Sequence, residues 1–207
     1  MQIIIHCINK IDDLKKIPQK YGVEIDIRGY GNKTLLNHDP IDDPLKYDEL
    51  ETYLKNFKHA FIIFNVKEAG YEQKIINLAA KYKIPKNKYF LLDVEFPYLY
   101  RATRKENIRE IAVRYSESEP IEMAKSQIIN SQPLLDWVWI DTNTTLPLSE
   151  NIINSLNYFK TCLVCPSRWG RPQDIAPYAK KIKNLNFKLD AVMTSQQYAE
   201  QWEKLMK

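Results

Sequence analysis

Histidines, closely spaced carboxylates and a lysine stand where short apolar runs end. His6 follows three isoleucines. Glu24 and Asp26 lie two residues apart within an apolar segment, and Lys67 closes another apolar run. Side chains two apart on a strand share one face, and two carboxylates on one face repel each other unless a cation lies between them. The spacing of Glu24 and Asp26 therefore predicts a site for a hard divalent cation, Mg²⁺ or Ca²⁺.

These residue types make chemical sense together on a phosphodiester. A cation held by the two carboxylates, with a side-chain oxygen from Asn65, would neutralise the phosphate together with cationic side chains such as Lys67. One imidazole would take the proton from the attacking hydroxyl, and the other would protonate the leaving alkoxide. Both forms of histidine are populated near neutral pH. The expected catalytic residues are His6, His38 and Lys67, and the expected metal ligands are Glu24, Asp26 and Asn65.

Each of these residues also has a structural interpretation. One carboxylate of the pair could simply be neutralised by Arg28 or Lys67, and Lys67 could cap its strand. Asn65 could be a turn former. His59, in a lysine-rich turn, is expected to be solvated. Only the joint placement of these side chains favours catalysis.

Eight β-rich runs, several of them continuously apolar, organise the chain. Continuous runs are typical of strands buried on both faces of a parallel sheet. The expected strands are Ile3–Ile5, Val23–Ile27, Phe61–Val66, Tyr89–Val94, Ile111–Arg114, Trp137–Ile140, Cys162–Cys165 and Ala191–Met193. The amphipathic segments between them are Asp12–Tyr21, Tyr47–Phe57, Gln73–Tyr82, Pro120–Asn130, Ser149–Phe159 and Gln173–Asn184.

This alternation predicts a compact (β/α)8 TIM barrel formed by one domain, residues 1–207. The length is near the lower limit for that fold, so some helices must be short, and Phe96–Arg109 lacks a clear helical pattern. The alternative is a doubly wound open sheet. No glycine-rich phosphate-binding motif follows any strand, which disfavours nucleotide-binding folds.

In a (β/α)8 barrel the carboxyl ends of the strands build the active site. Further polar residues at these ends would converge there as substrate contacts. They are Arg28, Asp93, Arg114, Glu117, Asp141, Arg168 and Arg171. Asp93 and Asp141 could instead be helix N-caps. The segment RWGR at 168–171 could clamp an anion between its arginines, or form a solvated loop with Trp169 on the rim.

Composition narrows the cellular context. Apolar residues make up 44% and charged residues 27%, which is typical of a folded globular chain. The net charge of +4 is spread along the sequence, so we expect no nucleic-acid partner. No stretch is long enough for a membrane span or a signal peptide. Three cysteines form no disulfide framework, and Cys162 and Cys165 are expected on opposite faces of a strand as core thiols. We expect a cytoplasmic protein.

Four motifs in order carry a family resemblance. His6, GVEIDIR (22–28), LLNHDP (35–40) and FNVKEAG (64–70) resemble the glycerophosphodiester phosphodiesterase group of the PLC-like phosphodiesterase superfamily. That group consists of (β/α)8 barrels. The resemblance implies that His6 and His38 are the acid and base and that Glu24 and Asp26 are metal ligands. Lys67 occupies the family's lysine position, and Asn65 stands where the family usually has an acidic ligand.

The later segments resemble a less characterised branch found among surface-polysaccharide and capsule-associated proteins. They are YFLLDVEFP (89–97), IAVRYSESEP (111–120), DWVWID (136–141) and CLVCPSRWGR (162–171). The chain departs from the family at strand one, where His6-Cys7-Ile8 replaces His-Arg-Gly. Arg28, Lys67 or Arg114 is therefore expected to supply the missing phosphate contact. The family's longer insertion after strand two is also short here.

The sequence thus predicts a metal-dependent phosphodiesterase acting on a small molecule, either a glycerophosphodiester-like or a sugar-phosphate substrate. Two alternatives remain open. A lyase would use a neighbouring substrate hydroxyl as the nucleophile and give a cyclic phosphate. A catalytically inactive barrel would serve as a binding module, which the changes at Cys7 and Asn65 favour. The oligomeric state has no signature in the sequence.

Overall fold

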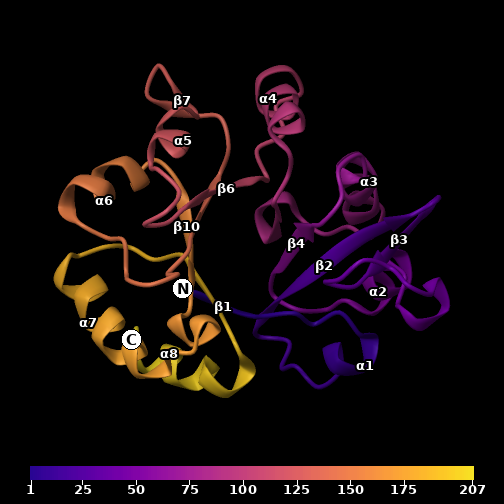
Figure 1. Cartoon of the computed structure of the whole chain (residues 1–207), viewed down its shortest axis with the longest axis horizontal. Coiled ribbons are helices and arrows are strands. Elements are labelled where there is room, and N and C mark those ends of the chain that lie inside the picture. The colour runs from indigo at the N-terminus through magenta and orange to yellow at the C-terminus, as the bar shows by residue number, and fades with distance from the viewer.

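The computed structural model describes residues 1–207 and places eight parallel strands in a nearly closed barrel (Figure 1). The order around the barrel is β5-β4-β2-β1-β11-β10-β9-β6. The predicted (β/α)8 fold is confirmed, and each expected strand is present. The bounds are β1 Gln2–Ile5, β2 Gly22–Tyr30, β4 Ile62–Val66, β5 Tyr89–Leu92, β6 Ala112–Tyr115, β9 Trp137–Ile140, β10 Lys160–Val164 and β11 Ala191–Thr194.

The edges β5 and β6 complete the ring through a single parallel bridge between Leu91 and Ile111. By contrast, β2 and β4 pair along five residues. Strand β3 (Lys33–Leu36) folds back and pairs antiparallel with the last four residues of β2, Ile27–Tyr30. A small hairpin of β7 (Ile128–Ile129) and β8 (Gln132–Pro133) lies outside the barrel.

Helices follow the strands and cover the outside of the sheet (Figure 1). None of them has the length and apolarity that a membrane crossing requires. Short 3₁₀ turns occupy 44–46, 86–88, 166–169, 172–174 and 196–198. The helices are α1 Ile11–Leu14, α2 Leu50–Asn56, α3 Glu72–Lys81, α4 Phe96–Lys105, α5 Glu122–Lys125, α6 Glu150–Leu156, α7 Ile175–Asn184 and α8 Ala199–Leu205.

Three helical predictions need correction. The segment 12–21 forms only the four-residue α1, because Pro18 cannot donate to a continuing helix. The segment 120–130 forms the equally short α5 and then turns into the β7–β8 hairpin at Asn130 and Ser131, both with positive φ. Conversely, Phe96–Lys105 is a helix, with Pro97 in its first turn.

The barrel separates two apolar cores. A cluster of 12 residues fills the interior, and a larger cluster of 47 lies between the strands and the helices. Cys162 belongs to the inner cluster and Cys165 to the outer one, and both are buried free thiols. This confirms the predicted opposite faces. The prediction that His59 is solvated is wrong: its side chain is buried, and Nε2 lies 2.9 Å from the Ile17 carbonyl oxygen.

Candidate active site at the carboxyl ends of the strands

Strand β2 carries the two carboxylates into the barrel. Val23, Ile25 and Ile27 face the outer core, so the alternating positions Glu24 and Asp26 face inward. Each carboxylate residue is only 1% exposed. A buried charge is costly unless it is paired and hydrogen-bonded. The surroundings of these two carboxylates, called here the carboxylate pair, must therefore be unusually polar.

Strand β4 supplies the first partners of the pair. The parallel register sets Asp26 opposite Asn65. Asn65 Nδ2 donates to Glu24 Oε1 at 2.9 Å and to Asp26 Oδ1 at 3.2 Å, so one amide bridges both carboxylates. Lys67 Nζ lies 3.2 Å from Asp26 Oδ1. The pair thus has one cationic partner for two negative charges.

The loop after β1 supplies partners that the sequence did not reveal. Asn9 Nδ2 donates to Asp26 Oδ2 at 2.9 Å, and Asn9 Oδ1 accepts from the Asp26 amide at 2.8 Å. The Cys7 amide donates to Glu24 Oε2 at 2.8 Å, with Cys7 in the left-handed region at φ 58°. A single asparagine in a loop has no distinctive sequence pattern. Its position three residues after His6 was the only available indication.

The two histidines lie at different depths of one cavity. His6 Nε2 is 3.9 Å from Glu24 Oε2. Burial, and next the positive charge of Arg168, lower the pKa of His6 to about 4. His38 is exposed, and its Nδ1 lies 2.9 Å from Asp39 Oδ1. A carboxylate can only accept, so Nδ1 carries the proton and Nε2 is left for proton transfer.

The opposite wall comes from β6, β9 and the turn after β10. Arg114 Nε and Nη2 contact the Asp93 carboxylate at 2.6 and 2.9 Å, and its Nη1 lies 3.2 Å from Asp141 Oδ2. Asp141 Oδ1 also accepts from Trp169 Nε1 at 2.8 Å. Arg168 lies over the Trp169 ring, 5.6 Å from its centroid. Asp93 and Asp141 are therefore partners of Arg114 rather than free groups.

Together these walls enclose about 160 Å³, named here the polar cavity. It brings together all six residues predicted to be catalytic or metal-binding, together with three of the expected substrate contacts. Two tryptophans and two apolar residues complete the lining. The lining residues are His6, Glu24, Asp26, His38, Asn65, Lys67, Arg114, Trp139, Asp141, Val164, Arg168, Trp169 and Met193.

Four predicted substrate contacts are not among the lining residues. Arg28 donates to the carbonyl oxygens of His38, at 2.8 Å, and Lys67, at 3.3 Å. It therefore fixes the main chain that carries two site residues. Glu117 accepts from the Thr144 hydroxyl at 2.8 Å.

Arg171 is engaged by its own turn, through Asp174 at 2.6 Å and Tyr178 at 2.9 Å. Asp93 reaches the polar cavity only through Arg114. These side chains have their hydrogen-bonding capacity committed to neighbouring protein groups.

The residues around the carboxylate pair fit a divalent cation. Burial, and next the Asp26 charge, raise the pKa of Glu24 to about 7. Asn65 Oδ1 is buried without a hydrogen-bond partner. No three His, Cys, Asp or Glu side chains converge into a ready-made metal centre. This donor set suits Mg²⁺, which keeps several waters and needs only one or two carboxylates plus substrate phosphate.

Comparison with known proteins places the fold. No family model and no curated protein matches the sequence. Among solved structures, a glycerophosphodiester phosphodiesterase from Agrobacterium tumefaciens superposes with a TM-score of 0.65 at 12% identity, over 93% of this chain and 96% of that one. A proposed glycerophosphodiester phosphodiesterase from Galdieria sulphuraria gives 0.61 at 12% identity, over 100% and 98%. The chain therefore shares the barrel fold of these phosphodiesterases along essentially its whole length.

Proposed function

We propose that the protein is a metal-dependent phosphodiesterase that cleaves small phosphodiesters of the glycerophosphodiester or sugar-phosphate type. One observation carries the proposal: two histidines, the carboxylate pair, Asn65 and Lys67 line a single small cavity at the carboxyl ends of β1, β2 and β4. The fold shared with phosphodiesterases supports it.

The charges of the polar cavity favour an anionic substrate. Lys67, Arg114 and Arg168 line it, and Arg168 forms no ion pair with a carboxylate. These cations can bind the non-bridging oxygens of a phosphodiester. A divalent cation held by Glu24 and Asp26, and by Asn65 Oδ1 once the amide that now donates to both carboxylates turns over, would add charge neutralisation at phosphorus when bound.

The two imidazoles can divide the proton transfers. One removes the proton from the attacking water as its oxygen bonds to phosphorus. The other gives its proton to the leaving alkoxide as the phosphorus–oxygen ester bond breaks. His6 is fixed beside Glu24, and His38 is held by Asp39 through its ring and by Arg28 through its carbonyl. The His6 ring is therefore positioned inside the cavity by one of its walls, and the His38 ring is held at its mouth from outside.

Turnover of bis(p-nitrophenyl) phosphate tests the proposal. We expect hydrolysis with Mg²⁺ or Ca²⁺, its loss on chelation, and a decrease in kcat/KM of at least about 100-fold in His6→Ala and in His38→Ala. The matched control is His59→Gln, a histidine outside the cavity whose replacement can still donate to Ile17. Activity that survives both chelation and His6→Ala would overturn the proposal.

Substrates with a neighbouring hydroxyl distinguish hydrolysis from transfer within the substrate. Phosphorus NMR separates a cyclic phosphate from a monoester, so the product identifies the nucleophile. Only the monoester is consistent with water as the attacking group. Binding of inorganic phosphate without turnover of any diester would instead favour the binding-module interpretation.

A further inference from the structure

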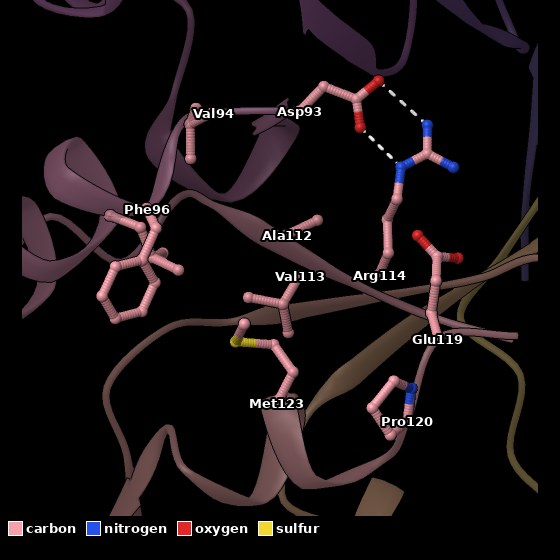
Figure 2. A pocket seen from close by; sticks show the side chains of 10 residues that line it. Asp93, Val94, Phe96, Ala112, Val113, Arg114, Glu119, Pro120 and Met123 are labelled. Carbon is pink, nitrogen blue, oxygen red and sulfur yellow. Dashed lines mark hydrogen bonds and ion pairs between the residues drawn. The ribbon is translucent and has the colours of Figure 1, made fainter.

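The incomplete pairing of β5 and β6 opens a second pocket beside the polar cavity. After the single bridge at Leu91 and Ile111, β5 ends at Leu92 and Asp93 turns the chain away with φ 61°. A pocket of about 310 Å³, named here the seam pocket, lies along the uncovered edge of β6 (Figure 2). Pockets that hold small ligands begin at about this volume.

The seam pocket is mainly apolar, and it reaches both faces of β6. Ala112 belongs to the interior core and Val113 to the outer core, yet both line the pocket because β5 does not pair with them, although β9 does on the other side. Phe96 from α4 and Met123 from α5 face each other across it (Figure 2). These two side chains are 56% and 39% exposed, so the pocket opens to solvent between α4 and α5.

One side chain belongs to both cavities. Arg114 lines the seam pocket, where Asp93 holds its Nε and Nη2, and it also lines the polar cavity, where its Nη1 reaches Asp141. A molecule bound by its phosphate in the polar cavity would therefore meet the seam pocket across this guanidinium. The two spaces are adjoining parts of one end of the barrel.

Of the two carboxylates at the seam pocket, Asp93 and Glu119, only Glu119 is free to set its charge preference. Both oxygens of Asp93 are taken by Arg114. Glu119 is held through its main chain by Ser116, while its half-buried carboxylate beside Arg114 makes no hydrogen bond or ion pair (Figure 2). A free carboxylate at an apolar pocket opposes binding of anionic groups.

We propose that the seam pocket binds the organic group on one ester oxygen of the phosphodiester, and that this group is apolar and not anionic. The inference rests on the proposed function and specifies its substrate class: a diester with one aryl or branched-alkyl arm, in place of a diester with two small polar arms. The apolar walls provide the affinity, Arg114 joins the arm to the phosphate, and Glu119 rejects carboxylated arms.

The experiment compares p-nitrophenyl phenyl phosphate with p-nitrophenyl methyl phosphate, which release the same leaving group. For the wild-type protein we expect kcat/KM to be at least about tenfold higher for the phenyl diester, because the ring buries apolar surface. The ratio should fall to about one in Met123→Trp, which fills the pocket from its mouth. The control Leu45→Trp adds the same side chain at an exposed site that lines neither cavity and should keep the wild-type ratio.

The charge preference is tested with p-nitrophenyl phenyl phosphate that carries a carboxylate on the phenyl ring. The wild-type protein should discriminate against this diester, and Glu119→Gln should remove most of the discrimination. The matched control is Glu122→Gln, on the neighbouring α5 turn, where the carboxylate is 70% exposed and paired with Lys125. The control should discriminate as the wild type does.

The outcomes separate the pocket from the reaction. Hydrolysis of both diesters with a ratio near one in the wild type would overturn the seam pocket and leave the phosphodiesterase proposal intact. A different outcome would support the pocket and reject the reaction. In it, neither diester is hydrolysed, but diphenyl phosphate binds more tightly than dimethyl phosphate, and Met123→Trp abolishes this preference. A wild-type ratio above ten that Met123→Trp does not change would also overturn the pocket.

Discussion

Strands β2 and β4 pair along five residues, whereas β5 and β6 meet at one bridge, and a different cavity lies at each junction. On the β2–β4 side the register fixes Asp26 beside Asn65, and the polar cavity is lined by hydrogen-bonded groups. On the β5–β6 side the strands part and leave apolar side chains around an open pocket.

The difference concerns what holds each cavity open. In the polar cavity the carboxylate pair is surrounded by donors from β1, β4 and their loops, so the side chains are fixed by directional bonds. In the seam pocket this holds for the Arg114–Asp93 pair, and the apolar walls are defined by packing. A preorganised polar site suits bond making and breaking, and an apolar pocket suits recognition by shape.

The largest effect should follow removal of the amide that bridges the carboxylate pair. Asn65→Leu leaves Glu24 and Asp26 buried without their shared donor. We expect the free energy of unfolding in urea to fall by about 2–5 kcal/mol. The control Asn56→Leu, at an exposed position of α2, should change it little. An equal effect at both positions would mean that the bridging bonds contribute nothing specific.

Asn9 tests whether the loop after β1 belongs to the site. Asn9→Ala removes both bonds to Asp26, one to its carboxylate and one to its amide. We expect a loss of about 1–3 kcal/mol in the free energy of unfolding. The same variant should also lower kcat, because Asp26 loses the two bonds that orient it. Unchanged stability and unchanged kcat together would exclude Asn9 from the site.

A matched pair of substitutions compares the packing at the two kinds of junction. Ala191 and Ala112 both belong to the interior core. Ala191 is flanked by paired strands on both sides, at Gln2 and Cys162, whereas Ala112 borders the seam pocket. We expect Ala191→Leu to cost about 1–3 kcal/mol by overpacking, and Ala112→Leu to cost less than about 1 kcal/mol because the pocket accepts the added methylenes. Equal costs in thermal unfolding would mean that the seam is as tightly packed as the rest.

The sequence predicted the paired side of the barrel better than the seam. All eight strands were recognisable because they are apolar blocks of the right length, and the parallel register then places Asn65 and Lys67 next to the carboxylate pair. Helix α4 was missed because its buried face mixes Tyr98 and Thr103 with Leu99 and Ala102. These positions do recur at helical spacing, but only two of the four residues are aliphatic.

The rest depends on distances that no local pattern contains. Asn9 becomes a site residue only because the β1 loop crosses beside β2. The seam pocket exists because Ala112 and Val113, which pair with β9, have no partner on the β5 side, and because Asp93 adopts a left-handed conformation, which is uncommon outside glycine. An apolar segment of sequence looks the same whether its neighbouring strand is present or parted.

A further substitution addresses the proposed metal site directly. Asn65→Asp adds a third carboxylate at the point where one amide now bridges two. Higher ligand charge tightens divalent cation binding, so we expect Mg²⁺ affinity measured by calorimetry to rise about tenfold, or about 1.4 kcal/mol. Without the cation the variant should unfold at a lower temperature than the wild type, because three carboxylates then repel one another. Bound Mg²⁺ should remove this difference in unfolding temperature.

The control Asn56→Asp adds the same charge on the surface of α2 and should alter neither the Mg²⁺ affinity nor the unfolding temperature. An affinity for Mg²⁺ that the buried substitution leaves unchanged would place the cation away from β2 and β4, and the contrast between a polar, cation-binding junction and an apolar one would then have to be redrawn.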